Sequence, residues 1–290
     1  MILVDLNQVM IGSLMVHLHR AQDEIDERLV RHIVLNNLRY YRTKFKEQYG
    51  ELILCNDDKE YWRREYFPNY KAGRKKDRAS SPYDWDKIFT CLNMVRDELK
   101  DNFPYISMRI LHAEADDIIA VLLMNRGEVK NIIVSSDKDF IQLHHLSDQY
   151  SPVTKELVNG HNPKTYLIEH ILKGDRSDGV PNVLSSDDTF VEHKRQKPMR
   201  RTTMVTLMEA MKEYDPETLY QIAKCNEDTW VRNWQRNSTL IDLTKIPENI
   251  VINILKEYDE KLESPKKRGN LLNYFIEHKL TNLIDDIQEF

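Results

Sequence analysis

The sequence is poor in glycine, with 8 glycines among 290 residues. Neither a G-x-G-x-x-G fingerprint nor a P-loop occurs in it. Both motifs use glycine to bring backbone close to phosphates, so dinucleotide-cofactor enzymes and NTPases lose their main support. The sequence also lacks any apolar run near the roughly 18 residues that a membrane helix needs. We therefore expect no membrane partner.

Cysteine is equally scarce. The 3 cysteines, Cys55, Cys91 and Cys225, lie far apart and form no C-x-x-C pair. This spacing fits a reducing compartment and argues against a zinc site. The chain starts at once on a strand-like run, Met1–Asp5, without the basic segment or cleavage site of a signal peptide. We expect a cytoplasmic protein.

Charge is distributed unevenly along the chain. The net charge of -5 argues mildly against a polyanionic partner, but two windows are strongly basic. Their basic residues are Arg63, Arg64, Lys71, Arg74, Lys75, Lys76 and Arg78 in the first window, and Lys194, Arg195, Lys197, Arg200 and Arg201 in the second. The first window is interleaved with tyrosine and tryptophan, which can stack on unpaired bases. Taken alone, the first window is more typical of a solvated loop, and the second of a linker.

Short apolar runs that end in acidic residues recur along the chain. Four predicted strands, Ile2–Val4, Leu52–Cys55, Tyr105–Leu111 and Ile132–Val134, alternate with predicted helices. This alternation indicates a parallel sheet covered by helices on both faces. Sites in such sheets form outside the carboxyl ends of the strands, where the acids should converge. The candidate residues are Asp5, Asp57, Glu114, Asp116, Asp117, Asp137, Asp139, Asp175 and Asp178.

This acidic set carries more negative charge than one small cavity tolerates without cations. Carboxylate oxygens favour a hard divalent cation, and Mg²⁺ takes only one or two protein carboxylates, so the set suits two ions. Two ions support in-line attack on a phosphodiester without a Ser, His or Cys nucleophile. Two alternatives stay open. A phosphatase of the Asp-x-Asp kind would need a second acid at the position of Asn7. A catalytically silent DNA-binding factor would bind DNA without cleaving it.

The chain is predicted to divide near residue 160. Residues 1–160 form the α/β domain, with 61–81 as a long, mobile basic and aromatic loop, and residues 161–290 form a helical domain. We predict helices near 163–173, 202–213, 216–223, 247–258 and 271–278, with a polar turn at Gly174–Pro181 after the first. The tail, Asp285–Phe290, is predicted to be solvated.

The ordered motifs resemble the 5′-nuclease (flap endonuclease) superfamily, and within it the phage RNase H branch. They are Asp5, Asp57, Tyr70-Lys71-x-x-Arg74, Glu114-Ala-Asp116-Asp117, Ser136-Asp137-x-Asp139 and Gly174-Asp175-x-x-Asp178. Asp57 followed by Tyr61-Trp-Arg-Arg64, and the closing Glu289-Phe290, look particular to that branch. The resemblance covers nearly the whole chain, and the ordered set is highly specific although each motif alone is weak.

The resemblance implies a PIN-like α/β core, a helical arch, and a smaller all-α C-terminal domain with a helix–three-turn–helix element that binds duplexes. It implies a 5′→3′ exonuclease and flap endonuclease on RNA–DNA hybrids and duplex DNA, removing lagging-strand RNA primers in phage replication. A free 5′ end or a flap would be the substrate. The implied state is a monomer, and a phage single-stranded DNA-binding protein is the implied protein partner.

By matching positions, the resemblance also assigns residue roles. Asp5, Asp57, Glu114 and Asp116 would hold one Mg²⁺, with Mn²⁺ as a substitute, while Asp137, Asp139 and Asp178 would hold a second. Asp117 and Asp175 would act through water. The implied catalytic residues are Asp5, Asp57, Asp116, Asp139, Lys71 and Arg74. The implied nucleic-acid contacts are Arg63, Arg64, Tyr70, Lys71, Arg74, Lys75, Lys194, Arg195 and Lys197. After Asp178 the chain lacks the later glycines of many relatives, so their amide-rich hairpin is not predicted.

Overall fold

The computed structural model describes residues 1–21, 25–127, 130–160, 162–191, 194–213, 216–264 and 270–290. The chain forms two compact units. The first unit combines Met1–Lys59, Tyr83–Asn159 and Glu248–Phe290, and the second combines Glu60–Pro82 with Gly160–Pro247. The expected domains, 1–160 and 161–290, differ from this grouping at both ends. Residues 60–82 pack with the helical unit, and residues from 248 onward pack with the α/β unit.

A six-stranded sheet in the order β3-β2-β1-β4-β5-β6 forms the centre of the first unit. The four predicted strands are present as β1 (Ile2–Asp5), β2 (Leu52–Asn56), β3 (Ile106–Arg109) and β4 (Ile132–Val134). All four are parallel, and Val4 pairs with both Leu54 and Val134. Because these strands are in register, their carboxyl ends meet at one edge of the sheet.

Two further strands were not predicted. They are β5 (Asp148–Ser151), parallel to β4, and β6 (Glu156–Leu157), antiparallel to β5. The predicted parallel sheet is therefore confirmed for β1 to β5, and β6 adds one antiparallel pair at its edge. A tight connection joins β5 to β6, and a connection this short allows only an antiparallel pair. Both strands are short and polar, so no apolar run marks them in the sequence.

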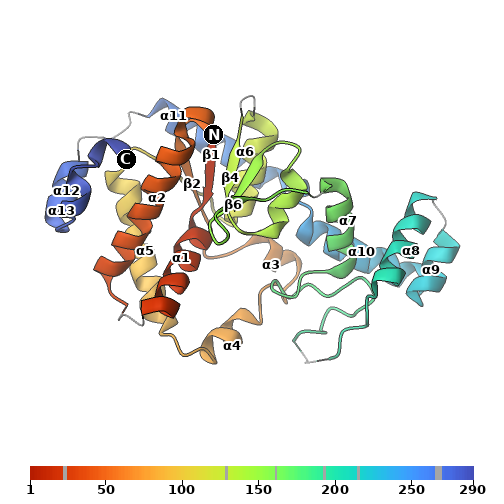
Figure 1. Cartoon of the computed structure of the whole chain (residues 1–290). Helices are drawn as coiled ribbons and strands as arrows, with labels where there is room; N and C mark the ends of the chain where they lie inside the picture. Colours follow the sequence, from red (N-terminus) through yellow and green to blue (C-terminus); the bar gives the residue numbers. More distant parts are fainter. Residues whose placement is uncertain (22–24, 128–129, 161, 192–193, 214–215, 265–269) are drawn as a thin grey trace. The chain divides into compact units, whose positions relative to one another are not determined.

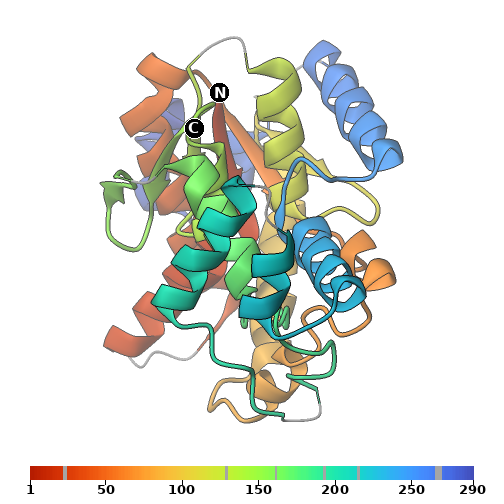
Figure 2. The same cartoon turned by 90° about the vertical axis from the view of Figure 1, so that its right-hand side faces the viewer.

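Helices cover both faces of the sheet (Figure 1). One face carries α1 (Leu6–Ala21), α2 (Glu27–Tyr49) and α5 (Trp85–Asn102), whose apolar side chains share a core with Ile2, Val4 and the matching positions of β2 and β4. The other face carries α6 (Ala115–Arg126), and α11 (Glu248–Glu263) runs beside α6 and covers β3 (Figure 2). The central strands are buried on both faces, as the apolar runs predicted.

Capping side chains set the ends of the two long helices. Asp26 accepts a hydrogen bond from the Leu29 amide at 2.7 Å, and Gly50, at φ 85°, ends α2. The next long helix has the same kind of start. Asp84 is its N-cap and accepts from the Lys87 amide at 3.0 Å, so α5 starts at Trp85.

The C-terminal tail is part of the core of the first unit. After α12 (Leu271–Glu277), α13 (Thr281–Ile284) and the 3-10 turn η2 (Ile287–Glu289), the Phe290 side chain is only 2% exposed. Its ring lies 5.3 Å from the Phe275 ring and 5.8 Å from the Phe103 ring, between centroids. The prediction of a solvated tail is wrong, because the final aromatic residue fills a gap between α5 and α12.

The second unit is helical. It contains α3 (Trp62–Tyr66), α4 (Arg74–Ala79), α7 (Pro163–Lys173), α8 (Arg201–Lys212), α9 (Pro216–Ala223) and α10 (Glu227–Ile241). The prediction that 61–81 is a mobile loop is wrong. The segment forms α3 and α4, and Phe67 and Tyr70 pack against Ile171, Val180 and Leu240. None of the described helices has the length and apolar character needed to cross a bilayer.

Helix α10 was not predicted, because much of its buried face is polar. Its buried residues include Asn233, Arg236, Asn237 and Ser238 beside Trp230. A helix of this kind shows too few apolar residues at helical spacing for the sequence to reveal it.

The packing of Phe290 predicts a large contribution to stability from the last residue. Phe290→Ala should lower the free energy of unfolding by about 3–5 kcal/mol, because it removes a buried ring and leaves a cavity. Urea unfolding followed by circular dichroism measures this change. Gln288→Ala, at an exposed neighbour, is the control and should change stability by about 0.5 kcal/mol or less. Equal effects from the two substitutions would contradict the packing role.

Candidate active site

Acidic residues from four strand ends meet at the carboxyl edge of the sheet. Asp5 ends β1, Asp57 follows β2, the segment Glu114–Asp117 follows β3 and opens α6, and Asp137 follows β4. The Asp57 and Asp137 carboxylates lie near enough to Asp5 to raise its pKa by repulsion. The predicted convergence of these residues is therefore observed in the first unit.

Asp5 is the buried centre of this group, with only 8% of its surface exposed. Its carboxylate accepts hydrogen bonds from the Gln8 amide at 3.2 Å and the Ser135 hydroxyl at 3.1 Å. Burial, followed by repulsion from Asp57 and Asp137, raises the pKa of Asp5 to about 7. Near neutral pH the site therefore holds negative charge that the surrounding protein does not compensate.

Asp57 connects three parts of the site. One carboxylate oxygen accepts from the Asn7 side-chain amide at 2.8 Å, and the other accepts from the backbone amide of Ala115 at 2.8 Å. Ala115 is the first residue of α6, where the positive end of the helix dipole favours an anion. The carboxylate is thus fixed between the start of α1 and the start of α6.

Glu114, Asp116 and Asp117 form a compact acidic group at the start of α6. Glu114 and Asp117 make a reciprocal capping box, in which the Glu114 amide donates to the Asp117 carboxylate at 3.0 Å. One ligand oxygen from each of the three residues lies within 4.8 Å of the others. Glu114 and Asp117 are buried. A set of carboxylate oxygens this close is able to share a hard divalent cation.

The turn after β4 presents Asp137 and Asp139 under backbone control. The Asp139 amide donates to the Asp137 carboxylate at 3.0 Å, and the Asp137 amide donates to the Ser135 hydroxyl at 3.1 Å. Gln149 from β5 donates its side-chain amide to the backbone oxygens of Ser135 and Asp137. Gln149 is therefore a supporting residue that sequence reasoning missed, because its strand was not predicted.

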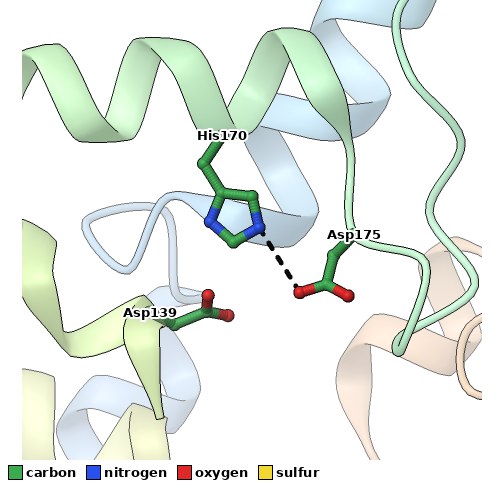
Figure 3. A group of neighbouring side chains, drawn as sticks. All are labelled: Asp139, His170 and Asp175. Carbon is green, nitrogen blue, oxygen red and sulfur yellow. Dashed lines mark ion pairs between the residues drawn. The ribbon is translucent and has the colours of Figure 1, made fainter.

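The two remaining acids lie in the second unit, in the turn after α7. The Asp175 carboxylate accepts from the backbone and hydroxyl of Ser177 at 2.7 and 2.6 Å and forms an ion pair with His170 at 3.3 Å (Figure 3). Burial alone would raise the pKa of Asp175, but the hydrogen bonds from His170 and Ser177 outweigh it and hold the pKa below its usual range. His170 was not a predicted site residue, since a single histidine on a helix carries no signal.

Asp178 is held by the motif Tyr70-Lys71-x-x-Arg74. The Tyr70 hydroxyl donates to its carboxylate at 2.9 Å, Arg74 donates at 2.7 Å, and the Lys71 ammonium lies 3.6 Å away. The Lys71 amide also donates to the Asp178 carbonyl at 2.7 Å. A side chain at Gly179 would place its Cβ 2.8 Å from the Asn69 carbonyl, so glycine permits this close approach. Two motifs about 100 residues apart in sequence thus bind each other.

Two predicted nucleic-acid contacts are buried instead. Arg63 is 1% exposed, donates to the Leu240 carbonyl at 3.0 Å, and lies over the Trp62 ring. Tyr70 is 2% exposed. The prediction that these two residues contact nucleic acid is wrong in this structure, because both fill the interior between α3 and α10.

Helix α10 braces the segment after Asp178 with polar side chains that sequence reasoning missed. Arg236 donates to the carbonyls of Pro181 and Asn182 at 3.0 and 3.2 Å, and Asn237 donates to the Pro181 carbonyl at 2.8 Å. Arg236 also pairs with Asp187. These contacts fix the backbone of the segment that follows Asp178.

A groove of about 680 Å³ lies in the second unit and is predominantly basic. The turn Asn69–Asp77, the turn 176–179 and the segments on either side of residues 192–193 line it. Its described charged lining residues are Arg74, Lys76, Arg176, Lys194 and Arg195, with Asp77 as the acid. The two basic windows of the sequence thus line one groove. Arg64, Lys75 and Lys197 are exposed, but they are not among its described lining residues.

Family models match nearly all of the chain. Residues 2–166 match the 5'-3' exonuclease N-terminal resolvase-like domain, and residues 162–290 match the C-terminal domain of T4 RNase H. The chain belongs to the 5'-3' exonuclease family. The N-terminal match includes every candidate ligand of the first unit, and the C-terminal match includes the turn with Asp175 and Asp178.

Relatives of this 5'-3' exonuclease family member include the ribonuclease H of Enterobacteria phage T4. The two sequences are 34% identical over 301 residues, which cover 99% of this chain and 95% of the relative. The flap endonuclease Xni of Shewanella sp. (strain ANA-3) is 30% identical over 142 residues, covering 45% of this chain and 51% of the relative.

Among solved structures, this chain is similar to the phage T5 D15 flap endonuclease in a pseudo-enzyme-product complex with DNA and metal ions. The two structures superpose with a TM-score of 0.61, and the sequences are 14% identical. The alignment covers 91% of this chain and 99% of that one. This likeness shows the fold of the 5'-3' exonuclease family: an α/β sheet flanked by helices, with a helical region.

The raised pKa of Asp5 predicts a pH-dependent stability in the absence of divalent metal. The pKa of Asp5 in the folded protein, about 7, exceeds its unfolded value of 3.8. Protonated Asp5 therefore contributes to the free energy of unfolding in full below pH 4, and this contribution is lost as the pH rises to about 7. The loss amounts to about 4 kcal/mol. Asp5→Asn should therefore melt at a higher temperature than the wild type at pH 8, and the difference should vanish at pH 4.

Thermal unfolding in EDTA at both pH values measures this. Asp101→Asn, at an exposed acid on α5, is the control and should change neither melting temperature. If Asp5→Asn and the wild type melt together at pH 8, Asp5 does not carry the buried charge.

Proposed function

We propose that this protein is a divalent-metal-dependent phosphodiester hydrolase that acts as a 5′→3′ exonuclease and flap endonuclease. Membership of the 5'-3' exonuclease family supports this activity. The structural observation that carries the proposal is the group of carboxylates around Asp5. Burial and the acidic neighbours raise the pKa of Asp5 itself to about 7. A site that concentrates negative charge in this way is suited to cations.

The donors at the strand ends fit a hard cation. They are carboxylate oxygens only, without the sulfur or imidazole that softer metals prefer. We propose that Asp5, Asp57, Glu114 and Asp116 hold one Mg²⁺ and that Asp137 and Asp139 contribute to a second, with Mn²⁺ as a substitute. When bound, such ions supply an activated water and neutralise the charge that develops on the phosphate. The roles of Asp117, Asp175 and Asp178 as further ligands stay predictions.

The basic groove supports a polyanionic substrate. Arg74, Lys194 and Arg195 line it, and cationic side chains of this kind bind phosphates without reading sequence. Lys71 and Arg74 are proposed to hold the phosphate that is cleaved. Because phage T4 ribonuclease H is a relative over nearly the whole chain, we propose RNA–DNA hybrids with a free 5′ end as substrates, beside duplex and flap DNA.

The wider role is proposed as removal of lagging-strand RNA primers in the cytoplasm of a phage-infected cell. A monomeric state and a single-stranded DNA-binding partner stay predictions. The Asp-x-Asp phosphatase alternative is disfavoured by Asn7, which uses its side-chain amide to bind Asp57. A carboxylate there would repel Asp57 rather than bind it.

Metal-dependent cleavage tests the proposed activity. With Mg²⁺, the wild type should release short 5′-phosphorylated products from an RNA–DNA hybrid, and EDTA should abolish the release. Asp139→Asn should lower the rate about a hundredfold or more, because it removes a carboxylate from the cation site. The exposed Asp101→Asn should cleave like the wild type. Full activity of Asp139→Asn, or no metal-dependent products, would overturn the proposal.

Binding to the groove is tested separately from cleavage. Arg195→Glu should weaken binding of a 5′-flap duplex in Ca²⁺ by about tenfold and should reduce the salt dependence of the affinity, because it removes a phosphate contact. Fluorescence anisotropy at several salt concentrations measures both. Lys245→Glu makes the same charge change at an exposed site of the second unit and should have a smaller effect. Equal losses of affinity in the two variants would show that the groove does not bind the substrate.

A further inference from the structure

A second cavity lies in the first unit, beside the edge strand β3. It has a volume of about 150 Å³. Strands β2 and β3 and helices α5 and α11 line it. The lining residues are Asn56, Ser107, the cations Arg96, Lys100, Arg109 and Lys261, and the acids Asp97 and Glu257. None of these residues is a proposed metal ligand or lines the basic groove. The cavity is smaller than the roughly 300–1,000 Å³ of sites for drug-sized ligands, so a matching ligand is small.

Two buried polar atoms of the lining residues lack a partner within the described part of the chain. They are the side-chain oxygen of Asn56 and the Nε of Arg109. Asn56 is 1% exposed, and its orientation is fixed because its amide donates to the carbonyls of Met108 and Leu54 at 3.0 and 3.3 Å. Buried polar atoms are normally hydrogen-bonded. Two lining residues therefore each carry a buried polar atom without a partner, an acceptor on Asn56 and a donor on Arg109.

The charge around the cavity favours an anion. Arg96 pairs with Asp97 at 2.8 Å, Lys261 with Glu257 at 2.7 Å, and Arg109 with Asp58 at 3.0 Å. Lys100 has no ion pair among the residues that the structure describes. Three of the four cations are thus neutralised, and one positive charge is left over beside the unpartnered Nε of Arg109.

We propose that this cavity binds a protonated phosphate group, either inorganic phosphate or the terminal phosphate of a nucleotide. Its P–OH donates to the Asn56 side-chain oxygen, and its anionic oxygens accept from Arg109 Nε and Lys100. A protonated phosphate is a small anion that offers a donor and acceptors at once. Sulfate carries no proton near neutral pH, and an internal phosphodiester carries none either, so neither satisfies Asn56.

Calorimetric titration of the full chain with inorganic phosphate tests the site. EDTA is included so that divalent metal at the acidic group does not recruit the anion. Phosphate should bind with one-to-one stoichiometry, and sulfate at the same ionic strength should bind at least about tenfold more weakly, because one hydrogen bond to a charged group is lost. Equal affinity for the two anions, or no binding at millimolar phosphate, would overturn the proposal.

Substitutions locate the binding. Lys100→Ala, at an exposed side chain that leaves the core intact, should weaken phosphate binding about tenfold, and Arg109→Gln should weaken it further. Lys87→Ala, on the same helix, is the control and should bind like the wild type. Unchanged binding in Lys100→Ala, or an equal loss of binding in Lys87→Ala, would place the anion elsewhere and contradict the proposal.

A 5′-mononucleotide distinguishes the two sources of the ligand. If it competes with phosphate and its binding is weakened by Lys100→Ala, the site takes a terminal phosphate. If it does not compete while phosphate binds and sulfate does not, the site takes free phosphate. Either result supports the phosphate site, and these titrations in EDTA are independent of the proposed nuclease activity.

Discussion

Repulsion between carboxylates at the carboxyl edge of the sheet is the constraint to which the first unit is adapted. Asp5 is buried beside Asp57 and Asp137, and its pKa rises to about 7. The surrounding structure limits the repulsion by fixing each carboxylate: Asn7 and Ala115 hold Asp57, and the start of α6 holds Glu114. Such fixed acids are unfavourable for folding without cations and therefore indicate a functional site.

In the second unit, buried charged groups have partners of opposite charge or hydrogen-bonding partners. Asp178 is surrounded by Tyr70, Lys71 and Arg74, and the buried Arg236 binds backbone carbonyls and Asp187. Burial lowers the pKa of Arg236, so the guanidinium depends on these acceptors. Each buried ion has partners inside the unit, which gives the segment around Asp178 a defined backbone without a glycine-rich hairpin.

The sequence predicted the sheet core and the acidic edge well. Apolar runs at Ile2, Leu52 and Ile132 correspond to strands, and the acids after them converge because parallel strands share one carboxyl edge. It did not predict β5, β6 or α10, whose polar residues show no apolar periodicity. The 61–81 segment is predicted to be mobile because its aromatic residues have no regular spacing, yet Phe67 and Tyr70 are buried against partners distant in sequence.

The sequence by itself therefore determined the candidates for chemistry: the ordered acids, the two basic windows and the motif around Lys71. These depend on residue type and on local strand ends, which short-range patterns report. Only the tertiary structure decided that Arg63 and Tyr70 are interior residues, that Phe290 closes a core, and that Gln149 and Arg236 support the site. Each of these roles depends on packing or hydrogen bonds between segments far apart in the chain, and no local pattern specifies which distant groups meet.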